Sequence, residues 1–333
     1  MLVISAADVH DLLTPAVCRD LMRAALTAVA DGQVFLPLRT VIRPPELGGL
    51  LGLMTAHLAG PEPAFGLKSV GVFPGNTLLG KDAHQGVVTL FDHETGEPLA
   101  IVNASAVTEI RTAAVSALAT EALARPGSRV LTIFGTGVQA RAHLNALTGP
   151  DSGLRLGSRS GSDSGSRSGF DEVRVVGRTF DAAFRFDERA RPFNDPAVAV
   201  AGADVIVTAT TAPDPILMAR WVEPGTHVNA VGSSIPTAAE LDPELLARAV
   251  LVADRRESLL TESGDYLRAA PLIGPDHVHG ELGDILTGRL PGRTSPEQIT
   301  VFKSLGLAIE DVIVARYLYE QALSTGRGQR VTF

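Results

Sequence analysis

The sequence is poor in the features that mark secreted, membrane and nucleic-acid-binding proteins. Its 333 residues contain one cysteine, Cys18, which excludes an internal disulfide framework and suits a reducing compartment. The net charge of −8 argues against nucleic acid or an anionic membrane surface as a partner, although a few local cations could still bind a small anion. The start, MLVISAADVHDLL, lacks the basic segment and long apolar core of a signal peptide, and no apolar run is long enough to cross a bilayer. We therefore expect a cytoplasmic protein that acts on a small molecule.

The length and the pattern of apolar residues predict two domains. A single core stops growing near ~250–300 residues. Residues 34–102 hold short β-type runs between proline and glycine turns, whereas near-continuous apolar runs after Arg129 are typical of parallel strands covered on both faces. We predict an α/β fold with a Rossmann-type doubly wound parallel sheet at 125–296. Residues 1–124 and 297–333 form a second, α+β domain in this prediction.

Helical segments join these two domains. A small-residue helix, SAVTEIRTAAVSALATEAL, is predicted to connect them, and a last helix over 295–323 is predicted to return to the first. Residues 150–169 are rich in glycine, serine and arginine and have little to bury. We interpret them as a flexible surface insertion, with a basic interaction patch as the alternative.

One glycine-rich turn predicts a dinucleotide site. Gly135, Thr136, Gly137, Val138, Gln139 and Ala140 fit the pattern G-x-G-x-x-A between a buried-type strand and a helix. The first glycine allows a tight turn, the second lets backbone amides approach a pyrophosphate, and the small third position brings helix and strand together. The free amides and the dipole at the helix start favour the phosphates. The motif is weak alone, but its place at the head of an α/β array favours coenzyme binding over a structural turn.

The end of the next strand bears on the choice of coenzyme. An NAD site usually has an acidic residue there for the ribose hydroxyl. This sequence has Gly177, Arg178 and Thr179 instead. Arg178 could pair with a 2′-phosphate and Thr179 could donate a hydrogen bond, so NADP(H) is favoured and NAD(H) remains the alternative. The other interpretation of Arg178 is a solvated side chain.

Three basic residues in the first domain are candidates for binding a carboxylate. Lys68 lies in an apolar strand, FGLKSVGVF, where an unpaired ammonium would be costly to bury. Arg111 is predicted in the first turn of the long helix, and Arg39 lies in LPLRTVI. Together the three could clamp a carboxylate. The alternative is internal pairing with acids such as Glu109.

Several stretches together resemble the ornithine cyclodeaminase/mu-crystallin family. They are GLKSV, EIRTAAVSALAT, FGTGVQA, GADVIVTAT, PGTHVNAVGSSIPTAAELD and VFKSLGLAIEDVIVARYLYE. The similarity covers nearly the whole chain and fails mainly at 150–169. It implies a homodimer built through the N-terminal domain, a Rossmann domain for the nicotinamide coenzyme, and an active site in the cleft between the domains.

Departures from the cyclodeaminase pattern favour the ketimine and imine reductase branch of this family. Cyclodeaminases use an aspartate where this sequence has Ser234, and a glutamate at a position that matches Gly52. Without these carboxylates, a base to activate an amine or water is lacking. The resemblance therefore implies hydride transfer from NADPH to a 2-imino acid, or to a 2-oxo acid plus an amine. The alternatives are ornithine cyclodeamination, an alanine-type dehydrogenase, and a non-catalytic NADPH-binding protein.

The resemblance also implies roles for individual residues. The carboxylate would be held by Arg39, Lys68 and Arg111, and Lys68 could also relay a proton. Substrate binding would involve Ser233 and Ser234. The nicotinamide side of the coenzyme would meet Thr210, Thr211, Val231 and Gly232, with Asn229 orienting the loop that follows it. No metal site is predicted.

Overall fold

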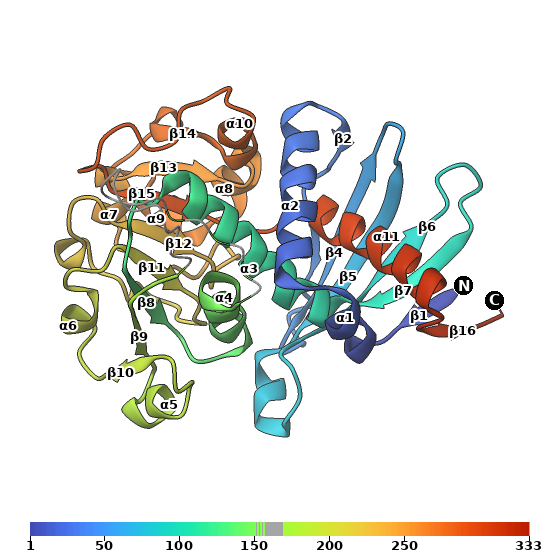
Figure 1. The fold of residues 1–333 in the computed structure, drawn as a ribbon, viewed down its shortest axis with the longest axis horizontal. Coiled ribbons are helices and arrows are strands. Elements are labelled where there is room, and N and C mark those ends of the chain that lie inside the picture. The colour runs from blue at the N-terminus through green and yellow to red at the C-terminus, as the bar shows by residue number, and fades with distance from the viewer. Residues whose placement is uncertain (151, 153, 155, 157–168, 333) are drawn as a thin grey trace. The chain divides into compact units, whose positions relative to one another are not determined.

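The computed structural model describes residues 1–150, 152, 154, 156 and 169–332 (Figure 1). The predicted insertion at 150–169 lies almost entirely outside these residues. The chain forms two compact units, Met1–Arg111 with Leu307–Phe333, and Thr112–Gly306. The division falls inside helix α3 (Ala104–Leu123) and in the turn before helix α11 (Ala308–Thr325), whereas the sequence suggested bounds near 124 and 297.

The first unit is a mixed sheet with helices. Its other elements are β1 (Leu2–Ile4), α1 (Ala6–Leu12), α2 (Pro15–Ala30), β2 (Val34–Phe35), β3 (Thr40–Ile42), β4 (Leu50–Leu58), β5 (Ala64–Val72), the 3-10 helix η1 (Pro74–Leu79), β6 (His84–Phe91), β7 (Pro98–Asn103) and β16 (Gln329–Arg330). The strand order is β16-β1-β7-β6-β5-β4-β2, with β3 pairing with β4. Only β1 and β7 run parallel among these pairs, so the unit has the predicted α+β character.

Helix α11 covers one face of this sheet, where it crosses β4, β5 and β6 (Figure 1). Gly66 in β5 makes the approach possible, because a Cβ there would lie 2.9 Å from the side chain of Val312. Residues along β4 alternate between buried and exposed, as expected for a strand with one covered face. The prediction of one helix over 295–323 is wrong in its first half, where Thr300–Lys303 form strand β15 and Gly306 turns the chain with φ +81°.

The second unit is an all-parallel sheet with helices on both faces. Its strands are β8 (Val130–Phe134), β9 (Glu172–Val176), β10 (Arg191–Phe193), β11 (Val205–Thr208), β12 (His227–Ala230), β13 (Val250–Ala253), β14 (Val278–Glu281) and β15. Its helices are α4 (Val138–Thr148), α5 (Phe180–Phe184), α6 (Pro196–Val200), η2 (Ala219–Trp221), α7 (Pro243–Arg248), α8 (Arg256–Glu262), α9 (Gly264–Ala269), η3 (Pro275–His277) and α10 (Leu282–Leu286). Two separate apolar cores pack against the two faces, which confirms the predicted Rossmann-type architecture.

The strand order places a switch point beside β8. The order is β10-β9-β8-β11-β12-β15-β13-β14, so the chain leaves β8 on one side and returns on the other at β11. In open parallel sheets, ligands bind outside the carboxyl ends of the strands at such a point. The glycine turn at 135–137 follows β8 directly.

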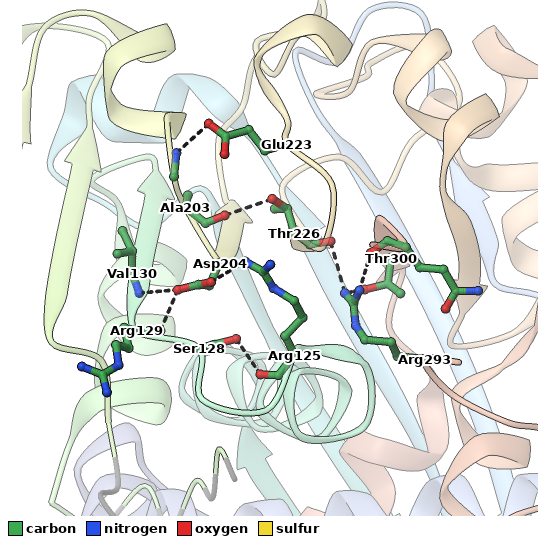
Figure 2. Close-up of polar contacts among 12 residues, drawn as sticks. Arg125, Ser128, Arg129, Val130, Ala203, Asp204, Glu223, Thr226, Arg293 and Thr300 are labelled. Carbon is green, nitrogen blue, oxygen red and sulfur yellow. Dashed lines mark hydrogen bonds and ion pairs between the residues drawn. The ribbon is translucent and has the colours of Figure 1, made fainter. Parts of the chain in front are cut away.

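The opposite, amino edge of this sheet is held by internal polar contacts (Figure 2). The carboxylate of Asp204 accepts hydrogen bonds from the backbone amides of Arg129 at 2.7 Å and Val130 at 3.1 Å, and pairs with Arg125 at 2.7 Å. Arg293 donates to the backbone carbonyl of Leu123 at 2.7 Å. Because these groups are satisfied by one another at the edge away from the glycine turn, we assign them to the fold.

Candidate active site

The first glycine of the dinucleotide motif is required by backbone geometry. Gly135 has φ +115°, a conformation that residues with a side chain rarely adopt. A Cβ at this position would also collide with the carbonyl of Ala209, which follows β11. The Gly135 amide donates to the carbonyl of Val176 at 2.9 Å. The turn is thereby held between β9 and β11 at the switch point.

The second glycine leaves room for a ligand. Gly137 is the N-cap of α4, and among the described residues no atom outside its immediate chain neighbours lies within 4 Å of a Cβ built on it. As glycine it offers no side chain to the amides of the first turn of this helix. Ala140, the small third position, is fully buried. An open N-terminus on an eleven-residue helix fits the pyrophosphate of a dinucleotide.

The end of β9 carries an exposed cation. Arg178 and Thr179 are both exposed, and Thr179 caps α5 by accepting a hydrogen bond from the amide of Ala182 at 3.2 Å. Within the described parts of the chain, no residue forms a hydrogen bond or ion pair with the Arg178 guanidinium. This exposed guanidinium fits both interpretations of Arg178, as a partner for an anionic group on the ribose and as a solvated side chain.

The loops after β11 and β12 contain the other residues predicted to contact the coenzyme. Thr210 is half-buried and Thr211 is exposed. Val231 is buried, and its amide and that of Gly232 both donate to the carbonyl of Thr208, at 2.9 and 3.1 Å. These bonds place the two loops side by side at the carboxyl edge of the sheet.

The two serines of the loop at 233–236 differ in burial, and their predicted part in substrate binding stays a prediction. The Ser233 side chain is buried and its hydroxyl donates to the carbonyl of Ala238, whereas Ser234 is half-buried. The expectation that Asn229 orients this loop is wrong. The Asn229 amide is fully buried and donates to the hydroxyl of Thr120 in α3 at 2.9 Å.

In the first unit, Lys68 and Arg111 meet in one buried cluster. The Lys68 ammonium lies 3.1 Å from Oδ1 of Asp311 and donates to the Thr108 hydroxyl at 2.6 Å. Arg111 donates from Nε to the same Asp311 oxygen at 3.3 Å and from Nη1 to Oε2 of Glu310 at 2.8 Å. The side chains of both cations are at most 5 % exposed. The ion pairing that the sequence left as the alternative is therefore present.

Three details of this cluster differ from expectation. Arg111 is the eighth residue of α3, which starts at Ala104, so it does not lie in the first turn. Glu109 lies 3.7 Å from His10 instead of pairing with these cations. Glu310 and Asp311 were missed, although two adjacent acids in the apolar run GLAIEDVIVA signal a buried partner. Arg39 lies half-buried between β2 and β3, and its predicted part in the clamp stays a prediction.

The surroundings of Lys68 change its acidity. Burial, with a smaller contribution from the nearby Arg111, lowers the pKa of Lys68 to about 8, although Asp311 opposes both effects. The ammonium can thus lose its proton close to neutral pH. Among the described residues no group of three histidine, cysteine or acidic side chains could hold a metal ion, and no helix there is long and apolar enough to cross a membrane.

Comparison with known proteins decides the family. Residues 1–155 and 164–326 match the ornithine cyclodeaminase/mu-crystallin family, which is most of the chain. The chain belongs to this family. Mouse ketimine reductase mu-crystallin is 42% identical over 294 residues, which cover 87% of this chain and 86% of the mouse protein.

Solved structures of family members have the same fold. Thermococcus litoralis Δ1-pyrroline-2-carboxylate reductase, in complex with NADH and L-proline, matches with a TM-score of 0.90 at 32% identity, over 99% of this chain and all of that one. An archaeal alanine dehydrogenase dimer with bound NAD matches with a TM-score of 0.89 at 32% identity, over all of this chain and 99% of that one. The two-unit architecture is thus shared along the full length.

Proposed function

We propose that this member of the ornithine cyclodeaminase/mu-crystallin family reduces the C=N bond of a 2-imino acid to an amino acid with a nicotinamide coenzyme. The main observation behind this proposal is that Lys68 and Arg111 lie together as two buried cations that can bind a carboxylate. The same chain also has the open glycine turn described above for a coenzyme. The similarity to a ketimine reductase and to a Δ1-pyrroline-2-carboxylate reductase supports the same reaction.

The residues of the first unit hold the substrate in this proposal. The Lys68 ammonium has three protons, and within the described part of the chain it donates to two acceptors, Thr108 and Asp311. Its third proton can therefore go to a substrate carboxylate, next to the Arg111 guanidinium. An iminium nitrogen is already protonated and draws electrons from its carbon, so the protein acts mainly by positioning and by excluding water. The bound coenzyme supplies the hydride.

We propose NADP(H) as the preferred coenzyme, held at the turn by Gly135, Gly137 and the first turn of α4. Arg178, exposed at the end of β9, would pair with the 2′-phosphate, with Thr179 beside it. The Thermococcus reductase binds NADH and the archaeal alanine dehydrogenase binds NAD, so NAD(H) is the alternative. The other contacts come from Thr136, Val138, Gln139 and Ala140, and at the nicotinamide end from Thr210, Thr211, Val231 and Gly232.

We also propose that the protein is a homodimer in the cytoplasm. Sheet residues of the first unit leave large apolar side chains exposed, among them Val41 at 50%, Ile42 at 45%, Leu51 at 40% and Phe65 at 40%. Exposed apolar patches of this kind mark interaction surfaces. The alanine dehydrogenase relative is a dimer, so a second copy of this chain is the partner that we propose. Leu51→Glu should shift the mass measured by light scattering towards the monomer, whereas Lys81→Glu, at an exposed position outside this set of apolar residues, should not.

The reaction is tested by following NADPH oxidation with preformed cyclic imino acids, and with 2-oxo acids paired with ammonia or small amines. The proposal expects turnover that Lys68→Ala lowers by about 100-fold or more while coenzyme affinity is kept. The matched control is Lys81→Ala, because Lys81 is exposed and outside the cluster.

Coenzyme binding without turnover of any imine would refute reduction and favour a non-catalytic binding protein. Release of ammonia and proline from ornithine would instead establish cyclodeamination, and NAD-dependent oxidation of alanine would establish an alanine-type dehydrogenase.

A further inference from the structure

One carboxylate joins the carboxyl ends of two neighbouring strands in the second unit. Oε1 of Glu240 accepts hydrogen bonds from the backbone amide and the hydroxyl of Thr210, both at 2.7 Å. Oε2 accepts from the Thr208 hydroxyl at 2.8 Å and from the Gly232 amide at 2.7 Å. Thr208 ends β11 and Gly232 follows β12. The fully buried Glu240 side chain therefore takes four donors from two loops.

A second ion pair extends this network to a third strand. Lys303, at the end of β15, lies 2.8 Å from Oδ2 of Asp265 and donates to the carbonyl of Ser233 at 2.5 Å. Oδ1 of Asp265 accepts from the amides of Glu240 at 2.7 Å and Leu241 at 2.9 Å. All three charged side chains are fully buried. The ends of β11, β12 and β15 are thus linked through charged groups that point into the protein.

The backbone is shaped to accept this network. A Cβ at Gly232 would collide with the backbone of Thr210 and with the carboxylate of Glu240. Glycine is therefore needed where the two loops meet. Buried carboxylates are costly unless they are paired and hydrogen-bonded, so apolar residues could join these strands at a lower cost. The particular gain from a carboxylate is that it fixes four donor groups at once.

We propose that Glu240 is a positioning residue that fixes the loops at 208–211 and 231–234 as a preformed surface for the nicotinamide half of the coenzyme. This inference rests on the proposed coenzyme site, because Thr210, Thr211, Val231 and Gly232 belong to that surface. It assigns Glu240 no contact with the coenzyme. The glycine turn and the first turn of α4, which take the adenosine half in the proposed function, form no hydrogen bond with the Glu240 side chain within the described residues.

The variant Glu240→Gln tests this division between the two halves. In this variant the side-chain NH2 of residue 240 replaces one of the two carboxylate oxygens and so faces the backbone amide of Thr210 or of Gly232. A backbone N–H can only donate, so that hydrogen bond is lost. NADPH affinity, measured by fluorescence titration, should fall by about tenfold or more, because one loop loses its hydrogen bond to residue 240 and a buried amide nitrogen then faces a backbone N–H. Affinity for adenosine 2′,5′-bisphosphate, measured by calorimetry, should stay as in the wild type. Amide hydrogen exchange at 208–211 and 231–234 should become faster in the coenzyme-free protein.

Asp204→Asn is the matched control at the opposite edge of the same sheet. Asp204 is also a buried carboxylate that accepts from two backbone amides, those of Arg129 and Val130. The Asp204→Asn variant should lower the free energy of unfolding without a selective loss of NADPH affinity.

If Glu240→Gln does not fold, Thr208→Val removes one of the four donors to Glu240 and should show a smaller loss of NADPH affinity. Wild-type NADPH affinity in Glu240→Gln and Thr208→Val, or equal loss of both ligands in either variant, would overturn the inference alone. A wild-type protein that binds neither NADPH nor NADH would overturn the proposed function as well.

Discussion

One oxygen of Asp311 serves two cations, because its Oδ1 lies 3.1 Å from the Lys68 ammonium and 3.3 Å from Nε of Arg111. The three residues come from β5, α3 and α11 and all are buried. Asp311 therefore sets both the distance between the cations and the acidity of Lys68. A carboxylate in this position keeps the ammonium charged although burial works against the charge.

The first prediction concerns the pH dependence of imine reduction. The pKa of Lys68 is lowered to about 8, so the ammonium that binds the substrate carboxylate is lost as pH rises through about 8, and kcat/KM should fall there. Asp311→Asn removes the group that raises this pKa, so the fall should begin at lower pH. The shift would be measured from plots of kcat/KM against pH with a preformed cyclic imine, after the protein has been equilibrated at each pH. Glu310→Gln should move the profile less, since Glu310 contributes least to the pKa of Lys68. An unchanged profile in Asp311→Asn would contradict this role.

The two motif glycines should respond differently to alanine. Gly137→Ala meets open space, so the unfolding free energy should change by less than about 1 kcal/mol, the usual range for such a cap residue, while the added methyl blocks the coenzyme phosphates. Gly135→Ala should cost at least about 1–3 kcal/mol because φ is +115° there, and the clash with Ala209 adds to this cost. Urea unfolding and coenzyme titration of both variants separate the two effects. Normal coenzyme binding by Gly137→Ala would rule out the proposed phosphate site.

Arg178 should decide between the two coenzymes. Replacing Arg178 with glutamine removes a charge-assisted bond to a 2′-phosphate, so KM for NADPH should rise by roughly tenfold while KM for NADH stays the same. Arg220→Gln is a suitable control, because Arg220 is another exposed arginine of the same unit, outside the site. Equal effects on the two coenzymes would remove Arg178 from this role.

Acid should destabilise the protein through a buried histidine. Burial lowers the pKa of His227 to about 3, from 6.5 in the unfolded chain. Its contribution to stability is complete above pH 6.5 and is lost as pH falls towards 3, by about 1.4 kcal/mol per pH unit. Urea unfolding from pH 7 to pH 4.5 should show a shallower decline for His227→Gln than for the wild type. The same slope in His227→Gln as in the wild type would contradict this role of His227.

The local features of the chain could be predicted because their causes are local. The glycine turn, for example, lies where the G-x-G-x-x-A pattern predicted it, between β8 and α4. The resemblance to the family, carried by residues along the whole length, also proved correct. Periodicity failed at β15, because ITVFKSLG is a short apolar run that fits a strand or a helix equally well.

The partners of buried charges could not be predicted, because they depend on contacts between distant parts of the chain. Asp311 is 243 residues from Lys68 in sequence and yet shares a hydrogen bond with it. Glu240 likewise reads as an ordinary acid before LDPE, and nothing local shows that it faces two strand ends. A buried acid can be suspected from its apolar neighbours, but its partner is fixed only by the packing of strands and helices.

The discontinuous order of the chain has a consequence for its synthesis. The first unit needs α11, which is made after the whole second unit, and β15 inserts between β12 and β13 although it follows both in sequence. While the ribosome is still translating residues 112–306, Lys68 and Arg111 have no Glu310 or Asp311 to neutralise them. Until β15 has been made, the edges of β12 and β13 that it will cover have no neighbour. The nascent chain therefore carries unpaired strand edges until β15 has been made, and holding chaperones can bind during that interval.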